Sequence, residues 1–450
     1  MTNIDTFLPG SGGGTIDSTK LRNQGRKCIL LHKKKDVDET LKLAKAVGLD
    51  VVECVFQSGK ENQKSFFGTG KLNSISAEFE MKNPTHPWYG VDLVLVHTNA
   101  SPIQIVELNK ILKLECWDRV RLLLNLFTTQ ANSVEAKLQV KLAKLNADKT
   151  IMREYANIQN RGERLGWGAG GKHALESNMK IIDREISTLL KKKSRREKSE
   201  RERRKHRIKN GIKSIGLVGY TNAGKSSLFQ NMAGKPVLIQ NQLFSTLETT
   251  IGRMQKSPRI LMVDTIGFVD NLPTILLDAF KSTIKESISC DLILLVVDIS
   301  DSKKEFKRKL QTTLTELESH KENFNLNLIQ PVLTKCDLVN EKKVLSFSEA
   351  LLNYNLKEPI ITSSVSNHGI ELLREVILTK LFQKPKTVSI LPPTENNHIS
   401  QLAIISHLHE LGYIISETKI DTRGEIQVTM WVDDVALIRY AAKSNNQLKI

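Results

Sequence analysis

The stretch that decides the fold is Gly219-Tyr220-Thr221-Asn222-Ala223-Gly224-Lys225-Ser226, which fits the pattern Gly-x-x-x-x-Gly-Lys-Ser/Thr. It follows an apolar, strand-like run at residues 215–218 and opens a helical pattern. Glycines let the backbone bend so that successive N–H groups point inward at a phosphate, and the helix N-terminus adds its positive dipole end. We expect Lys225 to neutralise the β- and γ-phosphates and Ser226 to bind Mg²⁺. This context favours a P-loop over a coincidental glycine and lysine loop.

Working outward, strand and helix patterns alternate from residue 212 to about residue 384. The strand-like runs lie at residues 215–218, 260–263, 292–297, 331–333 and 360–362. Strands that alternate with helices predict a parallel-rich sheet covered on both faces.

A second motif, Thr334-Lys335-Cys336-Asp337, comes directly after one of these runs. A fixed carboxylate at Asp337 can accept hydrogen bonds from both N–H donors on the edge of guanine, whereas adenine offers no such pair. Thr334 stands where most guanine-binding loops have Asn, and either side chain can hydrogen-bond locally. Ser363 and Ser364 follow the next strand and would complete the base pocket. Order and spacing after the P-loop make GTP the predicted nucleotide.

A third motif, Asp264-Thr265-Ile266-Gly267, ends the strand-like run at residues 260–263. We expect Asp264 to hold Mg²⁺ through a water and the Gly267 N–H to reach the γ-phosphate. Between this motif and the P-loop lies Phe244-Ser245-Thr246-Leu247-Glu248. We assign Thr246 as the residue that closes on Mg²⁺ when the γ-phosphate is present, with Thr249 and Thr250 as nearby rivals.

The predicted nucleotide-contacting set is, in chain order, Gly219, Tyr220, Thr221, Asn222, Ala223, Gly224, Lys225, Ser226, Ser227, Phe244, Ser245, Thr246, Leu247, Glu248, Asp264, Thr265, Ile266, Gly267, Thr334, Lys335, Cys336, Asp337, Thr362, Ser363 and Ser364. Of these, Lys225, Thr246 and Gly267 are the predicted catalytic residues, and Ser226, Thr246 and Asp264 are the predicted metal ligands.

Two residues bear on the rate of hydrolysis. Phe268 occupies the position where many GTPases carry the Gln that orients the attacking water, and Phe has no polar atom for that task. Intrinsic hydrolysis should therefore be slow and should depend on a further activator. Asn222 resembles the Asn of GTPases that use K⁺ where others use an arginine finger. The alternative is that Asn222 only braces the loop.

The remainder of the chain divides by composition. Residues 1–24 are rich in Gly, Ser, Thr and Asp and are expected to be disordered. Residues 25–130 should form a small α/β domain, with strands at 28–31, 51–56 and 91–96 and a helix at 37–46. We expect the P-loop domain to span residues 211–384, a proline-containing linker 385–394, and a small C-terminal α/β domain 395–450.

Residues 131–210 should form a long antiparallel helical hairpin. One apolar stripe comprises Leu138, Leu142, Leu145, Met152 and Tyr155, and the other comprises Met179, Ile182, Ile186 and Leu189. The second helix runs into residues 191–209, which hold 12 Lys/Arg and 3 Glu, a net +9 of the total +17. This concentration favours contact with phosphates over a merely solvated helix face. Nucleic acid is the first candidate partner.

Cysteine usage and hydropathy indicate the compartment. The 5 cysteines are dispersed without metal-ligand spacing, which fits a reducing cytosol rather than a disulfide framework. The N-terminal segment has no secretory apolar region, and the apolar run at residues 292–297 is far too short to span a bilayer. We expect a monomeric, cytoplasmic protein without a membrane span.

The P-loop stretch through Phe229, with Phe244–Leu247 and Asp264–Phe268, resembles the HflX family of ribosome-associated GTPases. The N-terminal region also resembles that family, through Gly68-Thr69-Gly70-Lys71, Asp118-Arg119 within the expected helix that includes residues 122–127, Glu135-Ala136-Lys137-Leu138-Gln139-Val140, and Leu142-Ala143. Two stretches depart from the family pattern. The hairpin loop carries Gly166-Trp167 in place of Arg-Gly-Pro-Gly-Glu, and Leu247-Glu248-Thr249-Thr250-Ile251-Gly252 replaces Leu-Asp-Pro-Thr-Thr-Arg. Trp167 would either stack on an exposed base or cover the hairpin tip.

The resemblance implies a GTPase that binds the large ribosomal subunit and its ribosomal RNA, with Mg²⁺ as cofactor, and that splits stalled ribosomes. Two alternatives remain open at this point. One is a GTP-gated ribosome-binding factor whose hydrolysis only times its release. The other is a tRNA- or membrane-linked GTPase of the same superfamily, which the lack of lipidation signals and of an amphipathic anchor disfavours.

Overall fold

The computed structural model describes residues 23–34, 36–131, 133–160, 170–209, 211–234, 249–268, 274–320, 326–393, 400–420, 424–444 and 447–450. The chain divides into two compact units. The first comprises Met1–Glu197 with Asn271–Lys281, and the second comprises Lys198–Asp270 with Ser282–Ile450.

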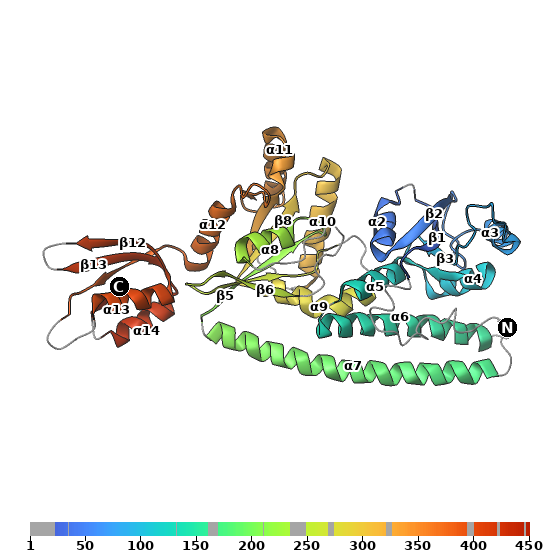
Figure 1. Cartoon of the computed structure of the whole chain (residues 1–450), viewed down its shortest axis with the longest axis horizontal. Helices are drawn as coiled ribbons and strands as arrows, with labels where there is room; N and C mark the ends of the chain where they lie inside the picture. The colour runs from blue at the N-terminus through green and yellow to red at the C-terminus, as the bar shows by residue number, and fades with distance from the viewer. Residues whose placement is uncertain are drawn as a thin grey trace. The chain divides into compact units, whose positions relative to one another are not determined.

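The first unit begins with a four-stranded parallel sheet in the order β2-β1-β3-β4. Its strands are β1 (Arg26–His32), β2 (Leu49–Phe56), β3 (Leu93–Val96) and β4 (Glu115–Trp117), and its helices are α2 (Asp38–Val47), α3 (Thr69–Met81), α4 (Pro102–Leu112) and α5 (Arg119–Gln130). Figure 1 draws these elements in blue and blue-green. β3 is buried along its whole length, because helices cover both faces of the sheet. The strands and the helix expected in this region are confirmed.

The helical hairpin is formed by α6 (Val134–Asn160) and α7 (Gly170–Lys209). Leu145, Met152, Tyr155 and Ile158 of α6 share a buried cluster with Ile182 of α7. Met179, Ile186 and Leu189 of α7 pack against that cluster. The two apolar stripes therefore face each other through Leu145, Met152 and Tyr155, whereas Leu138 and Leu142 are buried outside this cluster. Trp167 lies outside the described residues.

The second unit is built on a six-stranded sheet in the order β10-β9-β8-β5-β7-β6. The strands are β5 (Lys213–Gly219), β6 (Thr250–Gln255), β7 (Ile260–Asp264), β8 (Leu292–Asp298), β9 (Ile329–Thr334) and β10 (Ile360–Ile361). The five expected strands run parallel, and β6, which was not expected, pairs antiparallel with β7 at the edge.

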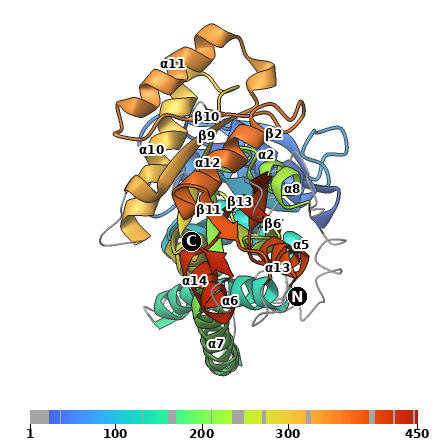
Figure 2. The ribbon, with the colours of Figure 1, turned by 90° about the vertical axis from the view of Figure 1, so that its left-hand side faces the viewer.

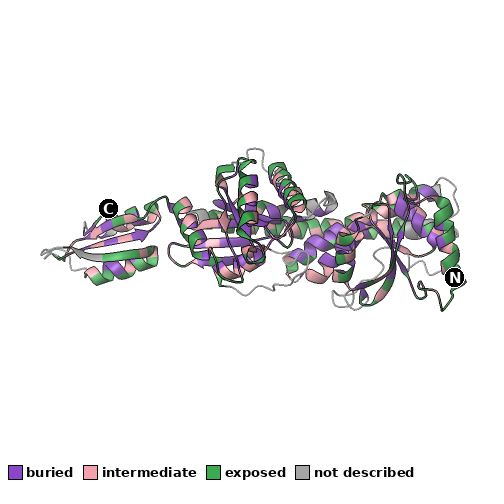
Figure 3. Ribbon diagram, turned by 90° about the horizontal axis from the view of Figure 1, so that it is seen from above, coloured by how far each residue is buried: buried purple, intermediate pink, exposed green. Residues whose placement is uncertain are grey.

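Helices cover both faces of this sheet. They are α8 (Lys225–Ala233), α9 (Thr274–Ile288), α10 (Lys303–His320), α11 (Glu341–Leu352) and α12 (Ile370–Phe382). Leu217 of β5 packs in one cluster with residues of α8 and α12. The preceding residue, Gly216, points to the other face, where a Cβ would lie 2.1 Å from the Ser287 carbonyl oxygen of α9. In Figure 3 the strands are largely buried and the helices are banded with exposed residues, as expected of this layering.

The C-terminal part of the second unit is a βαββαβ fold. Its elements are β11 (Lys386–Ile390), α13 (Gln401–Leu411), β12 (Tyr413–Ile420), β13 (Glu425–Trp431), α14 (Asp434–Lys443) and β14 (Leu448–Lys449). The antiparallel order β12-β13-β11-β14 is that of the ferredoxin-like split βαβ arrangement. Both helices lie on one face of the sheet (Figures 1 and 2).

One expected boundary needs correction. Residues 385–394 were expected to be a linker, but Lys386–Ile390 form β11, one of the two central strands of the C-terminal sheet. The prolines that suggested a linker, Pro385, Pro392 and Pro393, flank the strand rather than interrupt it. Within the described residues, none of the helices is long and apolar enough to cross a membrane.

Candidate nucleotide-binding site

The P-loop lies at the carboxyl end of β5 and leads into α8. Gly219 passes so close to β8 that a Cβ there would lie 2.2 Å from the Val296 carbonyl oxygen. Gly224 is the N-cap of α8 and has a φ of 89°. Leu228 and Phe229 anchor the helix in the buried core. The loop is therefore fixed at both ends by packing and leads directly into the N-terminus of α8, whose positive dipole end favours an anion.

Lys225 reaches back over the loop. Its Nζ donates hydrogen bonds to the carbonyl oxygens of Tyr220 (2.8 Å) and Gly219 (3.2 Å). The side chain is buried, and this desolvation lowers the pKa of the ammonium to about 8, against the opposing effect of Asp264. A buried ammonium that is bonded only to carbonyl groups in the described structure is suited to receive phosphate oxygens, because a phosphate compensates the positive charge better than carbonyls do.

Ser226 and Asp264 meet across the start of α8. The Ser226 hydroxyl donates to Asp264 Oδ2 at 2.8 Å, and Asp264, the last residue of β7, is fully buried. Mg²⁺ prefers hard oxygen ligands. It usually binds through one or two protein carboxylates together with substrate phosphates. The residues present therefore fit the metal that the sequence implies.

The segment after Asp264 closes against the P-loop. Thr221 N–H donates to the Phe268 carbonyl at 2.8 Å, and Phe268 N–H donates to the Gly219 carbonyl at 3.1 Å. Gly267 is pressed so tightly that a Cβ would lie 2.5 Å from Lys225 Nζ. The Phe268 side chain is buried. The Thr221 hydroxyl is also buried, and it has no hydrogen-bond partner in the described part of the chain. The loop thus contains a buried polar atom that a phosphate oxygen could satisfy.

The base side of the site is assembled from β9 and the segment after β10. Asp337 Oδ1 accepts a hydrogen bond from the Ser363 hydroxyl at 2.6 Å, and Cys336 N–H donates to the Thr362 carbonyl at 3.3 Å. Thr334 Oγ1 donates to the Ala223 carbonyl at 2.7 Å, so this residue ties β9 to the P-loop. The Asp337 carboxylate is exposed and is oriented by Ser363.

Two contacts in the site were not foreseen from the sequence. Asp298, the last residue of β8, pairs with Lys335 at 2.5 Å, and Lys335 Nζ also donates to the Asn222 carbonyl at 3.0 Å. The only available signal was the position of Asp298 directly after an apolar strand. In addition, the Tyr220 ring lies against two cations of α10, Arg308 and Lys309, each 5.4 Å from the ring centroid.

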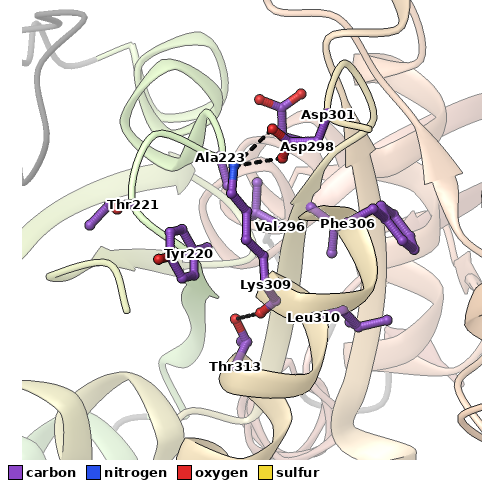
Figure 4. A pocket seen from close by; sticks show the side chains of 11 residues that line it. Tyr220, Thr221, Ala223, Val296, Asp298, Asp301, Phe306, Lys309, Leu310 and Thr313 are labelled. Atoms are coloured by element: carbon purple, nitrogen blue, oxygen red, sulfur yellow. Dashed lines mark hydrogen bonds and ion pairs between the residues drawn. The ribbon is translucent and has the colours of Figure 1, made fainter. Parts of the chain in front are cut away.

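Figure 4 shows the small pocket that lies beside Tyr220. Thr221 and Ala223 line it from the P-loop, and Lys309 lines it from α10. Lys309 is held by Asp301, at 2.7 Å. These charges are paired within the pocket wall, so the pocket adds no second polar site to the P-loop.

The structure brings together the predicted residues of all described motifs. The P-loop, the segment from Asp264 to Gly267, and the segment from Thr334 to Asp337 meet at the carboxyl edge of the central sheet, with Thr362 to Ser364 beside them. Asn231 of α8 donates to the Ser364 carbonyl at 2.9 Å and so fixes that last segment. The predicted residues Phe244, Ser245, Thr246, Leu247 and Glu248 lie outside the described residues.

Comparison with known proteins finds matches to the N-terminal domain and to the domain that carries the P-loop. A family model described as 50S ribosome-binding GTPase matches residues 214–335, and one described as GTP-binding GTPase N-terminal matches residues 34–128. The chain is 33% identical to the GTPase HflX of Methanocaldococcus jannaschii over 415 residues, which covers 91% of this chain and 97% of the relative. It is also 33% identical to the GTPase HflX of Thermofilum pendens, over 77% of this chain and 80% of the relative.

Among solved structures, a GTP-binding protein from Sulfolobus solfataricus in complex with GDP matches 80% of this chain and 99% of its own. The sequence identity is 25%, and the TM-score is 0.42.

Proposed function

The chain belongs to the HflX family of GTPases and hydrolyses GTP, and from that premise we propose that it acts on the ribosome. Its partner is the large ribosomal subunit, held mainly through ribosomal RNA phosphates, and its activity is the splitting or remodelling of stalled ribosomes. The observation that carries the proposal is a dense set of exposed cations on α7, the helix that leads directly into the central domain.

For the nucleotide we propose the following division of roles. Asp337 accepts the two N–H groups of guanine, and Ser363 keeps its carboxylate in place. Lys225 neutralises the β- and γ-phosphates, and the Gly267 N–H donates to the γ-phosphate. Ser226 and Thr246 would bind Mg²⁺ directly, and Asp264 would hold it through a water. The metal, when bound, neutralises charge that develops on the phosphate oxygens.

Phe268 is the reason why we expect slow GTP hydrolysis by the free protein. Its side chain is buried, and its backbone hydrogen-bonds to Gly219 and Thr221 of the P-loop. No polar side chain at this position orients the attacking water, so the free protein should hydrolyse GTP at about 10⁻⁴ to 10⁻² per second. We propose that the docked subunit provides the missing positioning. We also propose that K⁺, held by Asn222, supplies positive charge to the reaction.

The exposed cations of α7 are the residues that we propose to contact ribosomal RNA phosphates. Arg195, Arg196 and Arg203 are exposed, whereas Arg204 and Arg207 are half-buried and are engaged by the central domain. The three exposed arginines can therefore contact phosphate without disturbing that contact. Each phosphate they neutralise should steepen the salt dependence of binding by about 0.7 to 0.9 log units per log unit of salt.

The test measures GTP hydrolysis by the parent protein with and without purified large subunits, together with ribosome sedimentation in GTP. We expect the subunits to accelerate hydrolysis by on the order of 10³-fold or more and ribosomes to separate into subunits. The variant Arg195→Glu/Arg196→Glu/Arg203→Glu should lose subunit affinity and stimulation together. The matched control, Lys303→Glu/Lys304→Glu/Lys307→Glu, changes the net charge equally on exposed positions of α10 and should keep both.

Each outcome has one interpretation. If large subunits fail to accelerate hydrolysis, the ribosomal partner is wrong. If they accelerate it but ribosomes stay intact, the protein is a GTP-gated ribosome-binding factor rather than a splitting factor. If the two triple variants behave alike, the cations of α7 are only a solvated helix face.

A further inference from the structure

We propose that the carboxyl-terminal turn of α9 links the basic helix α7 to the segment that senses the γ-phosphate. In this arrangement Ser287, Glu286, Arg204 and Arg207 are positioning residues for hydrolysis, and they act through Thr265. The proposal deepens the proposed function, because it rests on the assignment of Asp264 to Gly267 as the metal- and γ-phosphate-binding segment. All the residues involved belong to the second compact unit.

The first step of the link joins α9 to the nucleotide motif. The Ser287 hydroxyl donates to Thr265 Oγ1 at 2.9 Å. Ser287 and Thr265 are 1% and 2% exposed, so this hydrogen bond is shielded from water and is expensive to break. Thr265 directly follows Asp264 and precedes Gly267 by two residues. A shift of Ser287 is therefore passed to the backbone that carries the metal ligand and the γ-phosphate donor.

The second step fixes the turn against β5. A Cβ on Gly216 would lie 2.1 Å from the Ser287 carbonyl oxygen, so α9 and β5 touch backbone to backbone. At this spacing the turn cannot slide along the strand without displacing it, because close-packed elements transmit strain. β5 ends in the P-loop, and the turn therefore contacts the strand that leads into the P-loop as well as the segment from Asp264 to Gly267.

The third step joins the same turn to α7. Glu286 pairs with Arg207 at 3.4 Å, and the Ser289 carbonyl accepts a hydrogen bond from Arg204. The end of α7 is also tied to the start of β5, since Ile212 N–H donates to the Arg207 carbonyl at 3.1 Å. Residues 286 to 289 thus contact Thr265 through one side chain and α7 through the neighbouring groups.

The turn also has room to respond. An open pocket is lined by Arg204 and Arg207 of α7, by Glu286 and Cys290 near the end of α9, and by Val263 of β7. Val263 directly precedes Asp264. The Arg207–Glu286 ion pair is half-buried and borders this pocket, so it can rearrange at modest cost, in contrast to the buried Ser287–Thr265 hydrogen bond. Movement should therefore begin at the arginines and be transmitted by the serine.

By linkage, α7 must then influence nucleotide binding even without a ribosome, because coupling between two sites is reciprocal. Breaking the Arg207–Glu286 pair should change the affinity for a non-hydrolysable GTP analogue relative to GDP, since only the analogue engages Gly267. A purely structural defect would weaken both nucleotides equally.

The experiment uses the full chain with Arg207→Glu, Glu286→Arg and the double charge-swapped variant. Affinities for the GTP analogue and for GDP are measured by stopped flow with fluorescent nucleotides, and stimulation is measured with saturating large subunits. We expect each single variant, and Ser287→Ala, to change the analogue-to-GDP ratio and to reduce stimulation, each by about fivefold or more. The swap should restore both quantities to within about twofold of the parent, because it rebuilds the pair.

The matched control is Lys386→Glu, which breaks another 3.4 Å ion pair of the same unit, with Asp434, far along the chain from the nucleotide motifs. It should leave the ratio unchanged. Equal weakening of both nucleotides in Arg207→Glu, or a charge swap that fails to restore the ratio, would overturn the link. If large subunits do not stimulate the parent protein, the ribosomal proposal fails, and the nucleotide ratio still decides on the link by itself.

Discussion

At the residue scale, guanine selection depends on Asp337. Its carboxylate is exposed but is oriented by the Ser363 hydroxyl at 2.6 Å. Asp337→Asn replaces an acceptor with a donor and should weaken GTP binding by about 3 kcal/mol, roughly a hundredfold. The same variant should gain affinity for xanthosine triphosphate, whose edge suits an amide. Equilibrium binding of both nucleotides checks this prediction, and unchanged GTP affinity would refute the base-pocket assignment.

Lys225 should make GTP binding depend on pH. Burial lowers the pKa of its ammonium from 10.5 to about 8, and bound phosphates must raise that pKa again. Binding is then coupled to proton uptake above pH 8, so affinity should fall as pH rises past 8, by up to about tenfold per unit. Below pH 7 the lysine is protonated in both the free and the nucleotide-bound protein, so its contribution to the affinity should not change with pH. Titrations with GDP between pH 6.5 and 9 measure this fall in affinity above pH 8. A Lys225→Ala variant should bind GDP more weakly at every pH and should not show the fall.

Asn222 gives a test of the monovalent cation. Its backbone is left-handed, with a φ of 63°, a conformation that Asn and Gly tolerate. Asn222→Gly therefore keeps the loop conformation and removes only the side chain. If Asn222 holds K⁺, the parent should hydrolyse GTP faster in K⁺ than in Na⁺ at equal ionic strength, and the glycine variant should lose that difference. Equal rates of the parent in the two salts would eliminate the K⁺ proposal and leave Asn222 as a brace.

The motifs of the site could be identified from the sequence because each depends on a few residues at fixed spacing. Gly219 to Ser226 and Asp264 to Gly267 are local patterns, and β-strand ends bring them to one edge of the sheet. The Asp298–Lys335 pair joins residues 37 positions apart, and the contact of Tyr220 with Arg308 spans 88 positions. Such contacts are set by tertiary packing, which no local pattern encodes.

At the element scale, Asp118 determines where α5 begins. The residue was expected to belong to the helix, but it is the N-cap and accepts a hydrogen bond from Arg121 N–H at 2.8 Å. Asp118→Ala should destabilise the first unit by about 1 kcal/mol, because the first turn loses its capping acceptor. Asp118→Asn keeps an acceptor and should be nearly neutral. Urea unfolding compares the variants, and equal losses in both would assign the effect to the charge rather than to the cap.

The strands that the sequence did not reveal are short or lie at sheet edges. β6 carries Gly252 and exposed Arg253 and pairs with only one neighbour, so its apolar alternation is weak. β14 has two residues. β11 alternates correctly, with Val388 and Ile390 buried, but its flanking prolines are typical of loops. Long periodic elements such as α6 and α7 were predictable because their apolar stripes repeat over many turns.

At the scale of the whole molecule, the central and C-terminal sheets share buried structure. Trp431 of β13 belongs to the same buried cluster as Leu378 and Phe382 of α12. The Ser257 hydroxyl, next to β6, donates to the Glu410 carbonyl of α13 at 2.9 Å. The C-terminal fold therefore contributes to the core of the central domain within the second unit, and a change in β13 should be felt at the nucleotide site.

Trp431→Ala should show this dependence. The side chain is 9% exposed, and deleting a buried Trp leaves a cavity that costs about 3 kcal/mol or more. The cluster includes α8 residues such as Phe229. The loss of stability should therefore appear when urea unfolding is monitored through the release of bound fluorescent GDP, and not only through a signal from the C-terminal fold. Tyr413→Ala is the control, since Tyr413 pairs with Trp431 in the sheet but is 49% exposed and should change stability by about 0.5 kcal/mol or less. If Trp431→Ala leaves the GDP-release transition where it is in the parent, the two sheets unfold independently, and the shared cluster does not couple the C-terminal fold to the nucleotide site.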